Sequence, residues 1–243
     1  MKPRLSSIMT CLLLILGVTG CNTDSGHSKQ RVRKKEFPDN AFADIPREFL
    51  KETEKRGTIV SINYETRFYA TNSDTFEKTA LVYLPYGYDQ DDKKKKYNVL
   101  YLLHGGGDDE KAYFKGTDKK TQIKNLLDNM IESGMIEPCI VVTPSYQNKY
   151  SSDETLSCKY FHNELAYDLI PAVEGKFNTY AKDTTEEGLK NSRLHRAFAG
   201  FSMGSAATWW TFTERLDIIG YFMPISGDSW CVTTMGGLKR SDD

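Results

Sequence analysis

The chain has 243 residues, with 32 Lys+Arg against 33 Asp+Glu, 12% aromatic residues and 39% hydrophobic residues. That length suits one large domain or at most two small ones, and the apolar content is too high for a disordered chain. A net charge of −1 offers no global basic excess for binding nucleic acid. No apolar run reaches the roughly 20 residues that cross a bilayer as a helix, which excludes a multi-pass membrane protein. We therefore expect a globular domain.

The N-terminus has the layout of a secretory signal, in which Lys2 and Arg4 precede a short apolar stretch over residues 11–18. The next residues, Val18-Thr19-Gly20-Cys21, resemble a bacterial lipobox, which makes Cys21 the expected lipidation site; an ordinary cleavage site is the alternative. Residues 1–21 are thus expected to be a lipoprotein signal peptide. The protein would be exported to the cell envelope or cell surface, and a lipid anchor would be its sole contact with the membrane.

Residues 22–57 are polar and are interrupted by Pro38 and Pro46, which predicts a tether between the anchor and the domain. Attraction of the basic cluster at residues 31–35 to anionic headgroups is the alternative role for this segment. The folded domain is expected over residues 58–243.

Runs of β-branched, aromatic and apolar residues predict strands, and apolar residues at a spacing of three to four predict helices. The strands are expected at 59–68, 79–84, 98–103, 139–143, 196–199 and 221–225, with a charged, solvated loop over 89–96. The helices are expected over 121–133, over 165–173 with a kink at Pro171, and over 203–215. This alternation predicts an α/β fold, with a mostly parallel sheet covered by helices on both faces.

A G-x-S-x-G element, residues 200–204, lies between a predicted strand and a predicted helix. Its outer glycines allow the tight, strained turn that exposes Ser202 Oγ at the carboxyl end of the strand. The same turn places the Met203 N–H at a helix N-terminus, where it can stabilise an oxyanion. This context predicts that Ser202 is a nucleophile; a glycine-rich turn without chemistry is the alternative.

A second glycine-rich element, His104-Gly105-Gly106-Gly107, follows directly on a predicted buried strand. Glycines there allow backbone N–H groups to approach a substrate carbonyl oxygen without interference from side chains. An oxyanion loop of this kind followed by a nucleophile turn is typical of serine esterases.

The segments 79–88, 100–107 and 200–204 resemble the putative-esterase family, and more narrowly the feruloyl esterases of carbohydrate esterase family 1. The resemblance extends over about residues 57–237. It implies an α/β-hydrolase fold and release of ferulate or acetate from plant xylan without a cofactor or metal. Feruloylated or acetylated xylan, or its oligosaccharides, is therefore the expected partner. The resemblance also implies that Ser202 is the nucleophile and that Met203 and Gly106 donate to the oxyanion, with Gly105 as the next candidate.

The sequence departs from this family in its catalytic triad. In α/β-hydrolases, the acid and the histidine of the triad follow the serine along the chain. Here no histidine follows Ser202. We expect none of the earlier ones to act as base: His104 belongs to the oxyanion loop, His162 opens a helix, and His195 lies at the far end of the nucleophile strand. Asp228 is expected at a turn or pocket edge rather than as the triad acid. We therefore expect a C-terminally incomplete domain that lacks the last strands of the fold and the triad acid and base, which puts its turnover in question.

Several interpretations remain open. Trp230 is a candidate for stacking on a feruloyl ring, with core packing as the alternative, whereas Trp209 and Trp210 are expected in the core. Cys139 is expected in the core, and Cys158 could pair with Cys231. An acetyl-xylan esterase or an acyltransferase would use the same residues, while the signal sequence disfavours cytosolic thioester hydrolases. From a different class, a catalytically inactive relative could bind glycan at the cell surface. No Cys or His spacing predicts a metal site.

Overall fold

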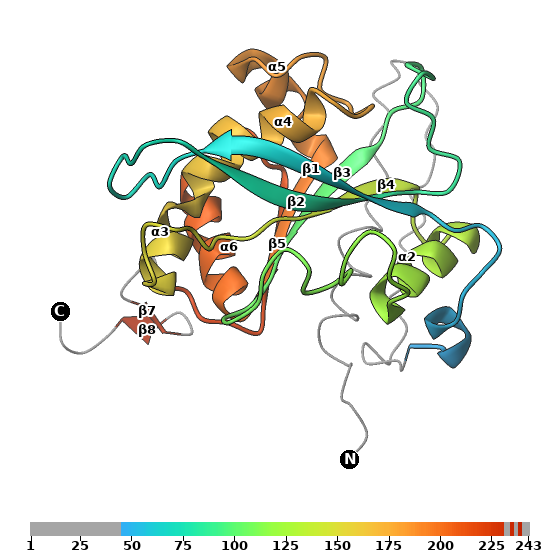
Figure 1. Cartoon of the computed structure of the whole chain (residues 1–243), viewed down its shortest axis with the longest axis horizontal. Helices are drawn as coiled ribbons and strands as arrows, with labels where there is room; N and C mark the ends of the chain where they lie inside the picture. The colour runs from blue at the N-terminus through green and yellow to red at the C-terminus, as the bar shows by residue number, and fades with distance from the viewer. Residues whose placement is uncertain (1–44, 231–233, 236–237, 240–243) are drawn as a thin grey trace, which may run out of the picture.

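The computed structural model describes residues 45–230, 234–235 and 238–239. The predicted signal peptide, Cys21 and most of the predicted tether lie outside these residues. The described chain forms a six-stranded sheet with helices on both sides (Figure 1). The strands are β1 Thr58–Thr66, β2 Phe76–Leu84, β3 Asn98–Leu103, β4 Cys139–Thr143, β5 Arg196–Phe201 and β6 Tyr221–Ile225, and β7 Thr234–Met235 pairs with β8 Leu238–Lys239 apart from this sheet. The helices are α2 Gln122–Glu132, α3 Glu154–Glu164, α4 Ile170–Glu174, α5 Glu186–Asn191 and α6 Met203–Glu214, with 3-10 turns η1 Arg47–Leu50 and η3 Arg193–His195 and a π-helical turn η2 Leu165–Leu169.

The sheet has the strand order β1-β2-β4-β3-β5-β6. Strands β3, β4, β5 and β6 are parallel to one another, while β1 and β2 form an antiparallel hairpin that joins the sheet through β4. The predicted α/β architecture is thus confirmed. The antiparallel pair arises because the connection over residues 67–75 is too short for a crossover, which needs a dozen residues or more.

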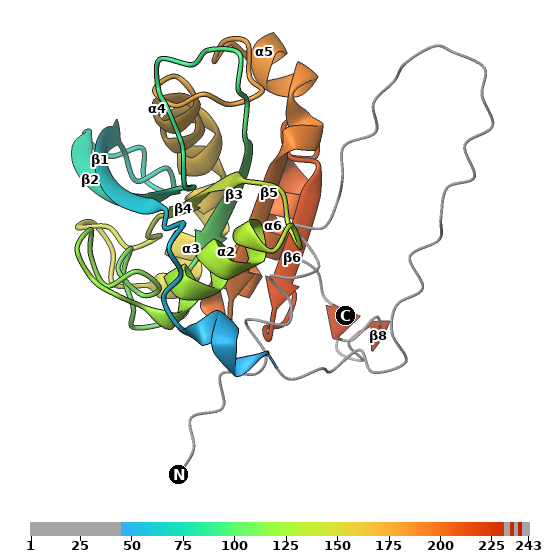
Figure 2. The same ribbon diagram turned by 90° about the vertical axis from the view of Figure 1, so that its right-hand side faces the viewer.

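Two apolar cores cover the two faces of the sheet. Side chains of β3 alternate between them, with Tyr101 in one core and Leu100 and Leu102 in the other. The first core also contains residues of α3, η2, α4 and α6, and the second contains residues of α2, so the helices lie in two layers (Figures 1 and 2). Burial on both faces explains why β3 and β4 appear in the sequence as uninterrupted apolar runs.

Residues 45–57 pack on the domain, and the tether predicted over 22–57 is wrong for this part. The η1 turn lies against α2, where Asn125 Nδ2 donates a hydrogen bond to the Leu50 carbonyl at 2.9 Å. The Gly57 N–H donates to the buried Asp128 carboxylate at 2.7 Å. The physical reason is apolar: Phe49 and its neighbours Ile45 and Leu50 cover the core around α2. Residues 22–44 lie outside the described chain.

The helix predicted over 165–173 begins earlier, at Glu154, and Asp153 caps it by accepting the Leu156 N–H at 3.0 Å. His162 therefore lies in the last turn of α3 and does not open a helix, which corrects the prediction. The expected kink at Pro171 takes the form of the π turn, in which the Ile170 N–H donates to the Leu165 carbonyl. Proline has no N–H to continue the ordinary ladder, so the register changes one turn before it.

No helix in the described part of the chain is long and apolar enough to cross a membrane.

Candidate active site

Ser202 occupies a strained turn between the end of β5 and the start of α6. Its φ is +55° and its ψ is −113°, a conformation that costs a residue with a Cβ on the order of 1–3 kcal/mol. Three backbone hydrogen bonds hold the turn: the Ser202 N–H donates to the Ile225 carbonyl at 2.9 Å, and the Ser202 carbonyl accepts the N–H groups of Ser205 at 2.9 Å and Ala206 at 3.3 Å. The side chain is exposed, as predicted for a nucleophile at the carboxyl edge of the sheet.

The outer glycines of this turn are sterically required. A Cβ on Gly200 would overlap the Gly204 carbonyl, and a Cβ on Gly204 would lie 2.5 Å from the His104 carbonyl oxygen. The G-x-S-x-G pattern therefore reflects close packing between the turn, the first turn of α6 and the loop after β3.

The glycine loop after β3 lies directly against this turn. A Cβ placed on Gly105 would be 3.4 Å from Ser202 Cβ, and one placed on Gly106 would be 3.1 Å from Met203 Cγ. The structure thus brings together all of the predicted nucleophile and oxyanion residues. Because Met203 begins α6, its N–H is among those at a helix N-terminus that have no intrahelical partner.

His104 braces the glycine loop. Its Nδ1 lies 2.7 Å from the Gly105 carbonyl oxygen and its Nε2 lies 2.8 Å from Ser145 Oγ. A carbonyl can only accept, so Nδ1 carries the proton and Nε2 accepts the Ser145 hydroxyl proton. Tyr146 donates a second hydrogen bond to the Gly105 carbonyl at 3.2 Å, and burial lowers the pKa of His104. With both ring nitrogens engaged, His104 positions the loop and is not placed to serve as a base.

Glu154, at the start of α3, also contacts the glycine loop. Its carboxylate accepts the Gly107 N–H at 3.2 Å, and its Oε2 would lie 3.1 Å from a Cβ on Gly106. No pattern in the sequence points to Glu154, because it lies in a polar stretch 47 positions after Gly107 and only the fold joins them.

The other described histidines lie away from the nucleophile. His195 precedes β5, at the end opposite Ser202 as predicted, and stacks on Tyr180 with ring centroids 3.6 Å apart. Nδ1 of His162 is buried and has no hydrogen-bond partner in the described chain. Burial, with a smaller effect from Arg215, lowers the pKa of His162 to about 4. No described side chain is hydrogen-bonded to Ser202 Oγ, and His27 lies outside the described residues.

The loop after β6 packs against the other side of the nucleophile turn. A Cβ on Gly227 would lie 2.5 Å from the Ser202 carbonyl oxygen. The exposed Asp228 accepts the Ser229 N–H at 2.8 Å, which is a turn role. Trp230 is 45% exposed. A substrate-binding role for either residue stays a prediction.

The packing resolves the expectations for Cys139, Trp209 and Trp210, whereas the pairing of Cys158 with Cys231 stays a prediction. Cys139 and Cys158 are buried free thiols, and Cys158 Sγ donates to the Met203 carbonyl at 3.5 Å; Cys231 lies outside the described residues. Trp209 and Trp210 are half-buried rather than core residues. The buried positions of α6 are instead filled by small side chains, namely Gly204, Ser205, Ala206, Ala207, Thr208 and Thr211. Among the described residues, no three His, Cys, Asp or Glu side chains are grouped as a metal site would require.

The family described as "Putative esterase" matches residues 73–230. The chain belongs to this esterase family. The chain is 42% identical over 189 residues to endo-1,4-beta-xylanase Y of Acetivibrio thermocellus, an alignment that covers 78% of the chain and 16% of the relative. It is 32% identical over 158 residues to an endo-1,4-beta-xylanase/feruloyl esterase of Xylanibacter ruminicola, covering 63% and 20%. The chain thus spans a fifth or less of the length of these relatives.

A solved structure of similar fold is the feruloyl esterase module from Clostridium thermocellum, a serine-to-alanine mutant in complex with sinapinate. It is 39% identical to the present chain, with a TM-score of 0.67, and the match covers 78% of the present chain and 61% of that module. A ferulic acid esterase from Anaeromyces mucronatus shares the fold at 24% identity and a TM-score of 0.56, covering 73% and 61%. The predicted α/β-hydrolase fold is confirmed.

Proposed function

We propose that this esterase hydrolyses ester bonds between ferulate and xylan through an acyl-enzyme on Ser202. The observation that carries the proposal is the contact between the strained Ser202 turn and the loop at Gly105 and Gly106. The substrate class is supported by the relatives, which are named as xylanases and feruloyl esterases, and by the sinapinate complex of a similar module.

In the proposed reaction, Ser202 Oγ attacks the carbonyl carbon of the ester. The charge that develops on the carbonyl oxygen is stabilised by backbone N–H groups of Met203 and Gly106, with Gly105 as the next donor. The bond to the sugar oxygen then breaks, and the sugar hydroxyl leaves with a proton. Water attacks the acyl-enzyme, releases ferulic acid and restores Ser202.

The serine proton needs an acceptor, and no histidine of the described chain reaches Ser202. The described residues therefore supply the nucleophile and the oxyanion donors, while a base is lacking among them. Serine hydrolases without their base retain a part of their rate from the oxyanion hole and from binding. An added base of small size should then accelerate the reaction.

The test measures hydrolysis of methyl ferulate by the wild-type chain and by Ser202→Ala, each with and without imidazole. We expect Ser202-dependent turnover that rises with imidazole concentration, and no response from Ser202→Ala. Equal rates for both folded proteins under both conditions would refute the proposal. If such a chain still bound xylo-oligosaccharides, it would be an inactive glycan-binding relative. Faster release of acetate from acetylated xylan would instead assign the acetyl ester as substrate.

The acyl side of the substrate is proposed to lie beside the loop after β6. Trp230 would stack on the feruloyl ring, and Asp228 would lie at the edge of the same pocket. Support comes from the exposure of the Trp230 ring and from the packing of Gly227 against Ser202. In Trp230→Ala, KM for methyl ferulate should rise while KM for methyl acetate, which has no ring, should stay constant.

We also propose that the protein is exported and lipidated at Cys21, which places it in the cell envelope or at the cell surface. The support is the lipobox-like sequence after the short apolar stretch. Expression with labelled palmitate should label the wild-type protein but not Cys21→Ser, and the variant should leave the membrane fraction. Equal labelling of both would refute this proposal.

A further inference from the structure

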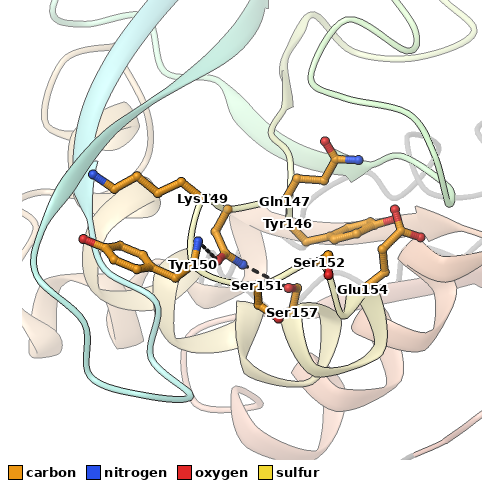
Figure 3. A pocket seen from close by; sticks show the side chains of 9 residues that line it. Tyr146, Gln147, Lys149, Tyr150, Ser151, Ser152, Glu154 and Ser157 are labelled. Carbon is orange, nitrogen blue, oxygen red and sulfur yellow. Dashed lines mark hydrogen bonds between the residues drawn. The ribbon is translucent and has the colours of Figure 1, made fainter.

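The segment that follows β4 lines an open hollow of about 510 Å³ beside the glycine loop (Figure 3). Its walls are formed by Tyr146, Gln147, Asn148, Lys149, Tyr150, Ser151, Ser152, Glu154 and Ser157. A second hollow of about 600 Å³ shares Gln147, Asn148 and Lys149 with the first and reaches residues 76–79 of β2. The shared residues place the two hollows next to each other, and together we call them the carboxyl-edge groove.

The topology explains why this groove lies on the same edge of the sheet as Ser202. Strands β3, β4 and β5 are parallel, so the loops that follow them meet at their carboxyl ends. Strand β2 is antiparallel to β4, with Leu81 opposite Thr143. The earlier residues of β2, including Phe76, therefore extend past the end of β4 at that same edge.

The groove joins the active site through two residues. Glu154 lines the groove and accepts the Gly107 N–H at 3.2 Å. Tyr146 lies buried at its base and donates to the Gly105 carbonyl at 3.2 Å. The groove therefore borders the glycine loop that packs against the Ser202 turn.

The side chains that line the groove combine an aromatic ring with hydrogen-bonding groups. The Tyr150 ring is 42% exposed and packs edge-on against Phe76 with centroids 5.5 Å apart. The Lys149 ammonium lies 5.1 Å from the Tyr150 ring centroid and 5.4 Å from that of Phe76. The exposed Gln147 amide and the hydroxyls of Ser151 and Ser152 complete the rim. A partly exposed ring with such a rim suits a pyranose, which has an apolar C–H face and a border of hydroxyl groups.

The charges of the groove favour an uncharged ligand. Lys78 is paired with Glu164 at 2.7 Å, and Glu110 is paired with Lys111 at 3.2 Å. The other charged side chains along the groove are the cation Lys149 and the carboxylates Glu77 and Glu154, a net charge of −1, so no cluster of cations is present to attract an anionic ligand.

The groove is also preorganised. Asn148 Oδ1 accepts the Tyr150 N–H at 2.9 Å, and its Nδ2 donates to Ser157 Oγ at 3.0 Å (Figure 3). These hydrogen bonds tie the loop to the first turns of α3. A ligand then binds without first ordering the loop, which lowers the entropic cost of binding.

We propose that the carboxyl-edge groove binds the xylose chain on the alcohol side of the ester. This inference rests on the proposed function for the identity of the sugar. Its polar rim and its position beside Gly107 fit a chain that remains attached until Ser202 is acylated.

Binding of ester-free xylohexaose to the wild-type chain tests the groove without any catalytic step. Titration calorimetry should show a Kd that weakens about tenfold or more in Tyr150→Ala and less in Gln147→Ala. Tyr86→Ala is the matched control, since Tyr86 is 54% exposed but follows the opposite end of β2, and its Kd should equal that of the wild type. Melting temperatures of all variants check that they are folded. Equal Kd values for all variants would overturn the inference.

A catalytic measurement then separates this inference from the proposed function. In Tyr150→Ala, the ratio of kcat/KM for a feruloylated xylo-oligosaccharide to kcat/KM for methyl ferulate should fall about tenfold. Turnover of methyl ferulate with an unchanged ratio would refute the groove and leave the esterase function standing. Xylohexaose binding that depends on Tyr150, without any Ser202-dependent turnover, would support the groove and refute the esterase function.

Discussion

The polar groups at the two ends of strand β5 differ in burial and in hydrogen bonding. At the amino end, Arg196 is 1% exposed, and its guanidinium donates to both oxygens of Glu174, at 2.5 and 2.7 Å. Its remaining N–H groups reach Ser192 Oγ at 3.0 Å and the carbonyls of Leu189 and Ile218. At the carboxyl end, six residues later, Ser202 is exposed in a strained conformation, with no described side chain hydrogen-bonded to its hydroxyl.

The amino end of the strand therefore contributes to stability, and the carboxyl end carries the reactive group. A buried charge is tolerated when every donor has an acceptor, as at Arg196. A nucleophile needs an accessible oxygen and donors that are left for the substrate, which leaves the turn less stable than its surroundings. Substitutions at the amino end should therefore change stability, and substitutions at the carboxyl end should change turnover.

The largest effect is expected at the amino end. Glu174→Gln should lower the free energy of unfolding by about 3–5 kcal/mol, because it leaves Arg196 charged and buried without a counter-ion. Urea unfolding followed by circular dichroism measures the change. Lys190→Gln, which breaks an exposed pair with Glu186 on α5, is the control and should cause no measurable change. A decrease in the free energy of unfolding no larger than that of the control would show that the pair of Arg196 and Glu174 does not stabilise the fold.

At the carboxyl end, Gly106→Ala should lower kcat for methyl ferulate about 100-fold with little change in stability. The new methyl group would lie 3.1 Å from Glu154 Oε2 and from Met203 Cγ, so these side chains or the loop must shift by a few tenths of an ångström, and a shift of the loop displaces the Gly106 N–H. Gly134→Ala, at a φ of +69° beyond α2, is the converse control. It should cost about 1–2 kcal/mol of stability and leave kcat unchanged. An unaltered kcat in Gly106→Ala would show that the Gly106 N–H does not donate to the oxyanion.

The strain at Ser202 itself predicts a smaller effect. Ser202→Gly should stabilise the fold by about 1 kcal/mol relative to Ser202→Ala, because glycine adopts a positive φ freely although it gains entropy in the unfolded chain. Both variants lack the nucleophile. The difference between their unfolding midpoints therefore reports the conformational cost of a positive φ at position 202. Equal midpoints would mean that the turn stores no strain.

The smallest effect is a dependence of stability on pH from His162, whose pKa is lowered from 6.5 to about 4, mainly by burial. Above pH 6.5 the ring is neutral in both the folded and the unfolded chain. As the pH falls toward 4, the unfolded chain takes up a proton that the folded chain does not, so stability is lost over this window. Partial exposure of the ring moderates the effect. The fall in melting temperature between pH 7 and pH 4.5 should be smaller in His162→Leu, and an equal fall would contradict the assignment.

Much of the sheet could be predicted from the sequence, because β3, β4 and β6 are continuous apolar runs whose limits agree with the structure to the residue. The prediction failed where the signal was weak. The buried positions of α3 include the polar Ser157 and Glu164, so its first half lacks an apolar stripe, and His162 was misplaced as a result. The first residues of β2 are half-buried or exposed and resemble a loop.

The nucleophile turn and the glycine loop could be predicted because steric limits impose glycine at fixed positions around Ser202. Glu154 and the carboxyl-edge groove could not, because they depend on how the segment after β4 folds back over the glycine loop. Their side chains are ordinary surface residues in the sequence, and the tertiary fold alone brings them to the active site.

Each face of the sheet holds one of the two buried cysteines of the described chain, and its reactivity can report the opening of that face. Cys139 lies in the core shared with α2, and Cys158, a residue of α3, lies in the core of the opposite face, where its Sγ contacts the first turn of α6. A thiol reagent can reach either sulfur only when the layer above it opens. In a chain whose other cysteines are replaced, the two labelling rates would therefore measure separately how often each face of the sheet is uncovered. Substrate that steadies the start of α6 should slow the reaction at Cys158 and leave that at Cys139 unchanged.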